Sequence, residues 1–184
     1  MPDLGRFLPL SNRPGSDEST VSRDRREQIA GVVASAARIV AATPPEQASG
    51  LAEEFVSAAR LREDVSPDEA GLLLLSTRVR EGRRRGIRSL SRVVRAYLLL
   101  AESAGVTAQL PPAVTGAVAL YAATTAPLPR RVVVAGHRVR ASDDGWEFGR
   151  GTRLEATGVQ IIAFLLAVSE QPPRPPAAPG TLGI

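Results

Sequence analysis

The sequence has no cysteine and only one histidine, His137, in 184 residues. The absence of cysteine excludes disulfides, thiolate catalysis and every metal site that uses cysteine ligands. A single histidine cannot form a histidine-rich zinc or iron site. A metal would need carboxylate ligands, and no clustered spacing of acidic residues marks such a site. We therefore expect neither a metal nor a cofactor.

Aromatic residues and lysine are scarce or missing as well. Phe, Trp and Tyr make up 4% of the chain, so a core must be built mostly from Ala, Val and Leu, with helix packed on helix. No lysine occurs, so all 23 basic residues are arginine. Together with the abundance of Ala, Gly and Pro, this bias is explained by the codon usage of a GC-rich genome more readily than by a function.

Long apolar segments are also missing. The longest apolar run, residues 161–168, is far shorter than the roughly 20 residues needed to span a bilayer. The first residues, Met-Pro-Asp-Leu-Gly-Arg, contain no apolar stretch of signal-peptide length. We expect a cytoplasmic protein without a membrane partner.

Composition divides the chain into four parts. Residues 1–21 and 171–184 are rich in Pro, Gly and small polar residues without periodicity, which predicts disordered tails. Between them, we expect a helical bundle over 22–105 and a small α/β domain over 106–170.

Apolar residues at helical spacing predict four helices in the first domain. One runs from about Ile29 and stops at Thr43. The next begins at Thr43-Pro44-Pro45-Glu46, with Thr43 as N-cap, and the third at Ser66-Pro67-Asp68-Glu69, with Ser66 as cap. A break between Gly82 and Gly86 precedes a fourth helix over about 87–104. Short connections indicate an antiparallel bundle.

The second domain begins with a helix over 112–125, and then the apolar period changes to two. Val132, Val134, Val139 and Ala141 predict a strand, and Asp144-Gly145 is typical of a hairpin turn. A return strand carries Trp146 and Phe148, a third covers 152–156, and a helix from 157 or 158 to 169 follows. The predicted class is α+β and mainly α, with a three-strand antiparallel meander between two helices.

The strongest charge feature is the segment from Arg78 to Arg95, where eight arginines and one glutamate give a formal charge of +7, against +4 for the whole chain. Helical spacing places Arg88, Arg92 and Arg95 on one face of the fourth helix, where they could neutralise phosphates of a nucleic acid. Alternatively, the face is solvated and pairs with Glu53, Glu54 or Glu63. No base-reading Asn/Gln cluster or aromatic platform accompanies it. The candidate binding residues are Arg84, Arg85, Arg88, Arg92 and Arg95.

The hairpin supplies two further candidate binding residues, His137 and Trp146. His137 stands near Asp143 and Asp144 in the sequence, an arrangement that permits a general base with a carboxylate orienter. No motif marks a nucleophile, so the alternative is a strand histidine beside turn-forming aspartates. Trp146 shares a strand face with Phe148, which indicates either packing on the terminal helix or a ligand platform.

The same segment carries a resemblance. Residues 136–151, read as Gly-His-Arg-Val-Arg-Ala-Ser-Asp-Asp-Gly-Trp-Glu-Phe-Gly-Arg-Gly, are followed by Gly158 and an apolar helix. From Leu110 to Glu170 the sequence resembles the C-terminal domain of the actinobacterial mycothiol-dependent maleylpyruvate isomerase family. The resemblance implies a preceding DinB-like bundle whose histidines bind the metal that activates the mycothiol thiol. Residues 1–109 contain no histidine.

Three functions follow as hypotheses. The first is a non-catalytic or divergent relative of that family, a binding or regulatory module for a small molecule or protein, with its cleft between bundle and sheet. The second is a nucleic-acid-associated protein that uses the basic surface from Arg83 to Arg95. The third, an active thiol transferase or isomerase, is disfavoured because the metal histidines are missing.

Overall fold

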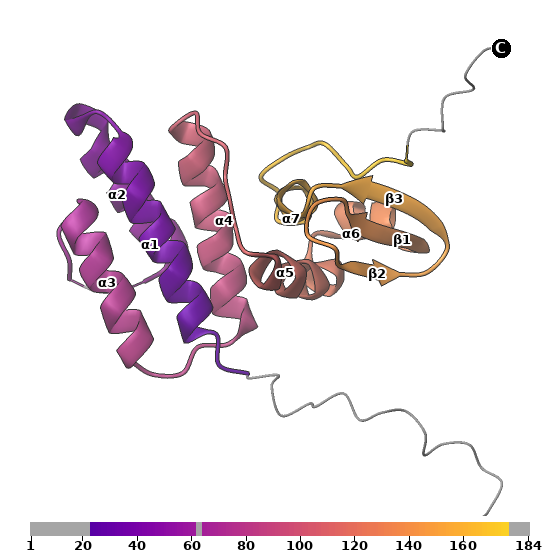
Figure 1. Ribbon diagram of the computed structural model, residues 1–184, viewed down its shortest axis with the longest axis horizontal. Helices are drawn as coiled ribbons and strands as arrows, with labels where there is room; N and C mark the ends of the chain where they lie inside the picture. Colours follow the sequence, from indigo (N-terminus) through magenta and orange to yellow (C-terminus); the bar gives the residue numbers. More distant parts are fainter. Residues whose placement is uncertain (1–22, 62–63, 177–184) are drawn as a thin grey trace, which may run out of the picture.

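A computed structural model describes residues 23–61 and 64–176 of the chain. Within these residues the first four helices form a bundle, and three further helices accompany a small sheet beside it (Figure 1). The expected class, α+β and mainly α, is confirmed. The elements are α1 (Arg26–Ala42), α2 (Pro45–Ala59), α3 (Glu69–Glu81), α4 (Ile87–Ser103), α5 (Pro112–Thr125), α6 (Leu128–Val134), β1 (His137–Ala141), β2 (Glu147–Gly149), β3 (Thr152–Ala156) and α7 (Gly158–Leu165).

In the bundle, α1 packs against α3 and α4, and α2 packs against α4 and α1. The buried faces are the apolar stripes that the helical spacing predicts, and one buried hydroxyl, Ser76 Oγ, donates to the Ala30 carbonyl at 2.9 Å. The start of α1, the end of α3 and the start of α4 lie at the same end of the bundle (Figure 1). The backbone N–H of Arg25 joins them by donating to the Arg85 carbonyl at 2.7 Å.

Both predicted N-caps of this bundle are wrong, although both helices exist. Pro44 occupies the N-cap position of α2, because the second proline, Pro45, takes the first helical position. The Thr43 hydroxyl instead donates backwards to the Ile39 carbonyl at 2.8 Å and helps to end α1. Asp68 caps α3, accepting from the Gly71 N–H at 2.7 Å, whereas Ser66 contributes backbone that lies against Gly71.

The sheet has the order β2-β1-β3, with β1 antiparallel to β2 and parallel to β3. The expected antiparallel meander is therefore wrong, because β3 pairs with β1 on the side opposite β2. Two glycines explain the crossing. Gly149 and Gly151 have φ of +81° and +107°, and a Cβ at either position would overlap the carbonyl oxygens of His137 or Gly136. The chain can thus pass closely over the start of β1.

The segment around Val132 and Val134 is helical, not extended as predicted. Pro129 sits in the first turn of α6, which the proline ring favours, and only Val134 of the two faces the core. The helix ends before Gly136, whose φ is +74°, and β1 begins at the next residue. The alternation of valines is typical of a strand, but the prolines at the start of this segment favour a helix.

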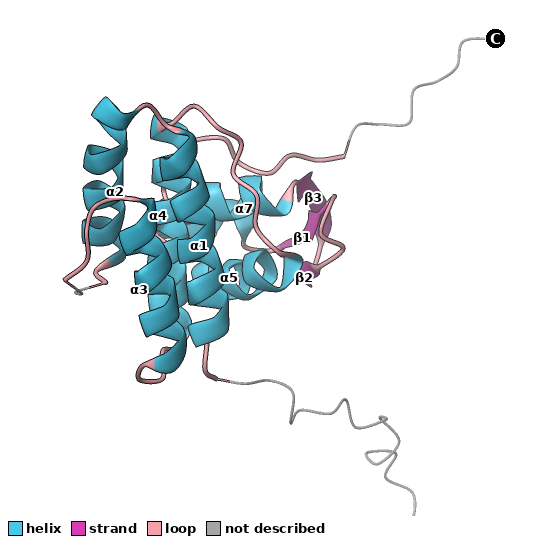
Figure 2. Cartoon of the chain, turned by 60° about the vertical axis from the view of Figure 1, so that its left-hand side comes forward, coloured by secondary structure: helices cyan, strands magenta, loops and turns pink. Residues whose placement is uncertain are grey.

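Two clusters of buried side chains hold the molecule together, and two helices contribute to both. The bundle cluster includes Val114 and Val118 of α5 and Ile162 of α7. The sheet cluster includes Ala122 of α5 and Ile161 of α7. In Figure 2, α5 and α7 accordingly lie between the bundle and the sheet. The predicted division at residues 105 and 106 falls in the connection between α4 and α5.

The C-terminal end of the described chain differs from the predicted tail. Residues 171–176 are placed, and Arg174 forms a bridge with Glu155 of β3 through two backbone hydrogen bonds of 2.6 and 3.0 Å. The predicted tail over 1–21 and the rest of the C-terminal one lie outside the described residues. Helix α7 ends at Leu165 rather than 169, because Ala167 takes a left-handed conformation. Among the described residues, no helix combines the length and apolar character needed to cross a bilayer.

Candidate nucleic-acid interface

Arginines from two chain segments gather at the end of the bundle where α1 and α4 begin. One segment spans 23–26 and the other spans 80–88, and backbone contacts join them: Arg25 N–H donates to the Arg85 carbonyl at 2.7 Å, and Arg26 Nη1 donates to the Gly82 carbonyl at 2.5 Å. We call this surface the arginine end. Its basic residues are Arg23, Arg25, Arg26, Arg80, Arg83, Arg84, Arg85 and Arg88.

Two acidic residues, Asp24 and Glu81, lie in the same segments, and Glu27 follows the first segment directly. Asp24 accepts hydrogen bonds from the backbone N–H groups of Arg26 and Arg85 at 3.2 and 3.3 Å, and forms an ion pair with Arg26 Nε at 2.7 Å. Burial raises the pKa of the Asp24 carboxyl, but these bonds outweigh it and hold the pKa below its usual value. Glu27 pairs with Arg80 at 3.0 Å.

Four arginines of this surface are exposed and form no ion pair with an acid of the described residues. Arg23, Arg83, Arg84 and Arg88 are exposed, and none of the ion pairs found within residues 23–61 and 64–176 involves them. Eight arginines against Asp24, Glu27 and Glu81 leave a formal charge of +5. The arginine end is therefore a strongly basic surface whose charges are available to a ligand.

The positions of these charges lower the stability of the folded chain when no ligand is bound. Gly86 is the N-cap of α4 and provides no side-chain cap, and Arg88 lies in the first turn. A cation at this positive end of a helix dipole costs about 0.3–1 kcal/mol, where an anion would be stabilised by a similar amount. Neighbouring like charges add repulsion. A bound anion would offset both effects.

The structure separates the predicted arginines into two groups. Arg84, Arg85 and Arg88 belong to the arginine end, whereas Arg92 is half-buried further along α4. Arg95 serves a structural role, since its Nε donates to the Leu166 carbonyl at the end of α7 at 3.1 Å. The alternative of pairing with Glu53 or Glu54 is not observed in the ion pairs of the described chain, and Glu63 lies outside it.

Sequence reasoning missed Arg23, Arg25 and Arg26. The available signal was their position, because three arginines just before and at the start of a helix oppose its dipole. Their proximity to residues 83–88 depends on the packing of α1 beside α4, which no local pattern specifies.

The structure does not assemble a catalytic group around His137. This side chain is half-buried, with Nδ1 3.0 Å from the Ala135 carbonyl oxygen. Asp143 and Asp144 are used elsewhere: Asp143 accepts from the Gly158 N–H at 2.7 Å, and Asp144 accepts from the Thr115 hydroxyl. Neither carboxylate is therefore available as its orienter.

Trp146 is likewise part of the internal structure. Its indole Nε1 donates to Thr115 Oγ1 at 3.0 Å, and its ring stacks near Phe148 with centroids 6.1 Å apart. One edge of the ring lies 3.2 Å from where a Cβ on Gly116 would stand. These contacts indicate packing against α5 rather than a ligand platform.

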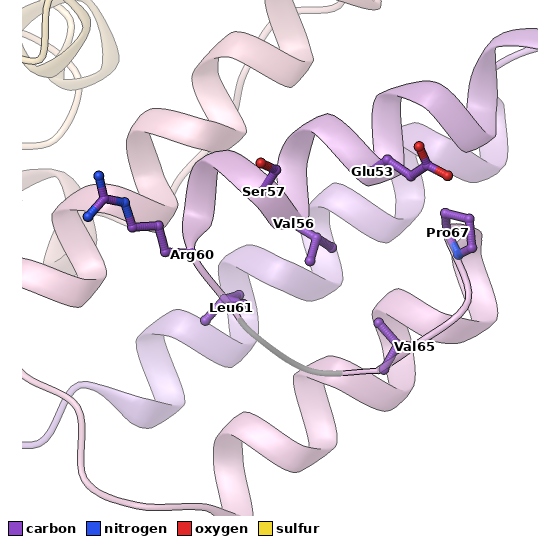
Figure 3. Close-up of a pocket in the computed structure, with 7 residues that line it drawn as sticks. All are labelled: Glu53, Val56, Ser57, Arg60, Leu61, Val65 and Pro67. Atoms are coloured by element: carbon purple, nitrogen blue, oxygen red, sulfur yellow. The ribbon is translucent and has the colours of Figure 1, made fainter.

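A cavity of about 480 Å³ lies between α2 and the α2–α3 connection (Figure 3). Its middle is apolar, formed by Val56, Leu61 and Val65. Figure 3 shows the two charged side chains, Glu53 and Arg60, at opposite ends of the lining. An acid–base pair does not converge here, so the cavity does not point to catalysis.

Nor do the described residues bring three His, Asp or Glu side chains together as metal ligands. Comparison with family models, curated proteins and solved structures finds no match. The arginine end is the most distinctive feature of the described surface.

Proposed function

We propose that this chain is a non-catalytic binding protein that holds nucleic acid through the phosphate backbone at its arginine end. The observation that carries the proposal is the cluster of exposed arginines, brought together from residues 23–26 and 80–88, that form no ion pair within the described part of the chain. Neutralising phosphates releases condensed counterions, which is the main source of affinity in sequence-independent binding.

Arginine suits this ligand because its planar guanidinium forms paired hydrogen bonds with phosphate oxygens. Segments 23–26 and 80–88 have no aromatic residue for stacking on bases and no Asn or Gln for reading their edges, and the neighbouring Gln28 bonds to Arg25 and to the Ala113 carbonyl. We therefore propose backbone contact with little sequence preference. A cytoplasmic location is part of this proposal.

The resemblance of the C-terminal part to the mycothiol-dependent maleylpyruvate isomerase family is compatible with a non-catalytic role. Three of the residues that carry it, Asp143, Asp144 and Trp146, bond to α5 and α7 and serve the internal structure. We propose that this part is a divergent scaffold and that the family's metal-dependent thiol transfer is absent.

The test replaces Arg83, Arg84 and Arg88 by alanine and measures binding to a fluorescent DNA duplex over a range of salt concentrations. We expect a loss of affinity of at least about tenfold at low salt, and a salt slope shallower by about 0.9 for each phosphate contact removed. Far-UV circular dichroism checks that the helices remain.

The matched control replaces Arg138, Arg140 and Arg150, three exposed arginines on and beside the sheet, and removes the same charge. We expect it to bind nearly as well as the unaltered chain. Equal losses in both variants would show that net charge alone attracts the DNA, and unchanged binding of the first variant would exclude the arginine end.

A further inference from the structure

The chain after α7 returns to the sheet and lies along the outer edge of β3 (Figure 1). Its start is anchored by Arg130 of α6, whose guanidinium pairs with Glu170. Its middle is held at β3, where the Glu155 N–H donates to the Arg174 carbonyl at 2.6 Å and the Arg174 N–H donates to the Glu155 carbonyl at 3.0 Å. We call residues 171–176 the strap.

The composition of the strap limits its contact with the sheet. Residues 172–176 are Pro-Pro-Arg-Pro-Pro, and because proline has no N–H, Arg174 is the only backbone donor among them. In an antiparallel bridge, the residues on either side of the bonded one direct their backbone groups away from the partner strand. These residues are Pro173 and Pro175, which offer no donor to a further strand. The strap therefore covers the edge without presenting a new one.

The edge beneath the strap can pair with more than the strap offers. The parallel pairing with β1 uses the backbone groups of Leu154 and Ala156, so those of Arg153 and Glu155 point outward. Among the described residues, the strap meets this edge in a single bridge, at Glu155.

This edge is also complementary to itself. If two copies met antiparallel about a two-fold axis at Leu154, Arg153 of each copy would lie opposite Glu155 of the other. The outward backbone groups of both residues would then be bonded. Opposite charges directly across two strands favour their pairing, and both pairs of such a contact have this arrangement.

We propose that the outer edge of β3 is a pairing surface for a second copy of this chain and that the strap keeps it closed. The contact would be isologous and would join the two sheets into one. The charges select a second copy, because a strand without an acid and a base at these two positions would leave Arg153 and Glu155 unmatched. The strap prevails in the single chain because it is covalently attached, which gives it a high effective concentration.

The test replaces Arg174 by proline in the full chain and measures the oligomeric state by analytical ultracentrifugation over a range of protein concentrations. Arg174→Pro removes the only donor of the strap and puts a ring where the N–H meets the Glu155 carbonyl, so the bridge cannot form. Dimerisation should then be at least about tenfold tighter, because neither copy has to release its strap first. Arg174→Ala is the matched control, since it removes the same side chain but keeps the N–H, and this protein should remain monomeric like the unaltered chain.

A second variant releases the strap without touching its donor. Pro173 is buried, so Pro173→Asp would place a charge where it is poorly solvated and should also produce dimers. The pairing itself is tested in the Arg174→Pro protein. Adding Glu155→Arg there would put arginine opposite arginine and should abolish the dimer. Mixing this protein with one that carries Arg153→Glu instead should restore a dimer of the two.

Two folded but monomeric release variants, with unchanged circular dichroism, would overturn the proposal. Equal dimerisation of the unaltered chain or of Arg174→Ala would show that the strap does not close the edge, and would overturn it as well. A dimer that survives Glu155→Arg would place the contact elsewhere and would exclude the β3 edge. All these measurements are made without nucleic acid and leave the arginine end intact, so their result is independent of the proposed function.

Discussion

At the scale of single residues, the hairpin between β1 and β2 shows how a conspicuous motif acts as a structural joint. Asp144 accepts a hydrogen bond from Thr115 of α5, whose hydroxyl in turn accepts from the Trp146 indole. Asp143 accepts from the Gly158 N–H at the start of α7. Two adjacent aspartates therefore fix two different helices, and an anion at the N-terminus of α7 also matches its dipole.

Gly158 has no room for a side chain in this joint. A Cβ there would overlap Asp144 Oδ2, and that carboxylate cannot withdraw without losing its bonds to Thr115 and Trp146. We expect Gly158→Ala to lower the free energy of unfolding by about 1–3 kcal/mol, measured by urea denaturation.

The control for this prediction is Gly50→Ala on α2, where a Cβ meets nothing within 4 Å. We expect it to stabilise the protein slightly, by about 0.5–1 kcal/mol, because alanine favours a helix over glycine. A Gly158→Ala protein as stable as the unaltered chain would contradict the tight contact.

At the scale of elements, local signals predicted the positions of most helices, because an apolar stripe at helical spacing depends only on nearby residues. The strand over 152–156 was also predicted at its observed bounds. The pairing of that strand was not, because partner choice depends on the crossing of Gly149 and Gly151 over β1. The α6 helix shows the same limit, since alternating valines resemble a strand until the prolines before them are weighed.

For the arginine end, too, local signals could be predicted from the sequence and long-range contacts could not. The sequence concentrates charge around Arg83 to Arg88, and this could be predicted by counting residues. The contribution of Arg23, Arg25 and Arg26 could not, because it requires α1 and α4 to begin side by side. The role of Arg95 also depends on a long-range contact, with the end of α7.

The cap of α3 gives a prediction at this scale. Because Asp68 accepts from the Gly71 N–H, we expect Asp68→Ala to lower the free energy of unfolding by about 1 kcal/mol in thermal or urea denaturation. Ser66→Ala should have a much smaller effect, since the Ser66 hydroxyl does not cap the helix. The reverse order of the two effects would restore Ser66 as the N-cap.

At the scale of the whole molecule, α7 connects the two parts that composition suggested as separate domains. Two neighbouring residues of this helix belong to different clusters. Ile161 packs with the sheet cluster and Ile162 with the bundle cluster, and both are fully buried. Helix α5 makes a similar double contribution through Val118 and Ala122. A core shared in this way couples the stability of one part to that of the other.

This coupling predicts a single unfolding transition. Trp146, the only tryptophan, reports on the C-terminal part by fluorescence, whereas far-UV circular dichroism is dominated by the bundle helices. The two signals should change at the same urea concentration. Ile162→Ala leaves a cavity on the bundle side of α7 and should lower the free energy of unfolding by about 2–5 kcal/mol in both signals together. If the fluorescence transition alone moved, the bundle would fold independently of α7, and the arginine end would then be a property of the bundle rather than of the whole protein.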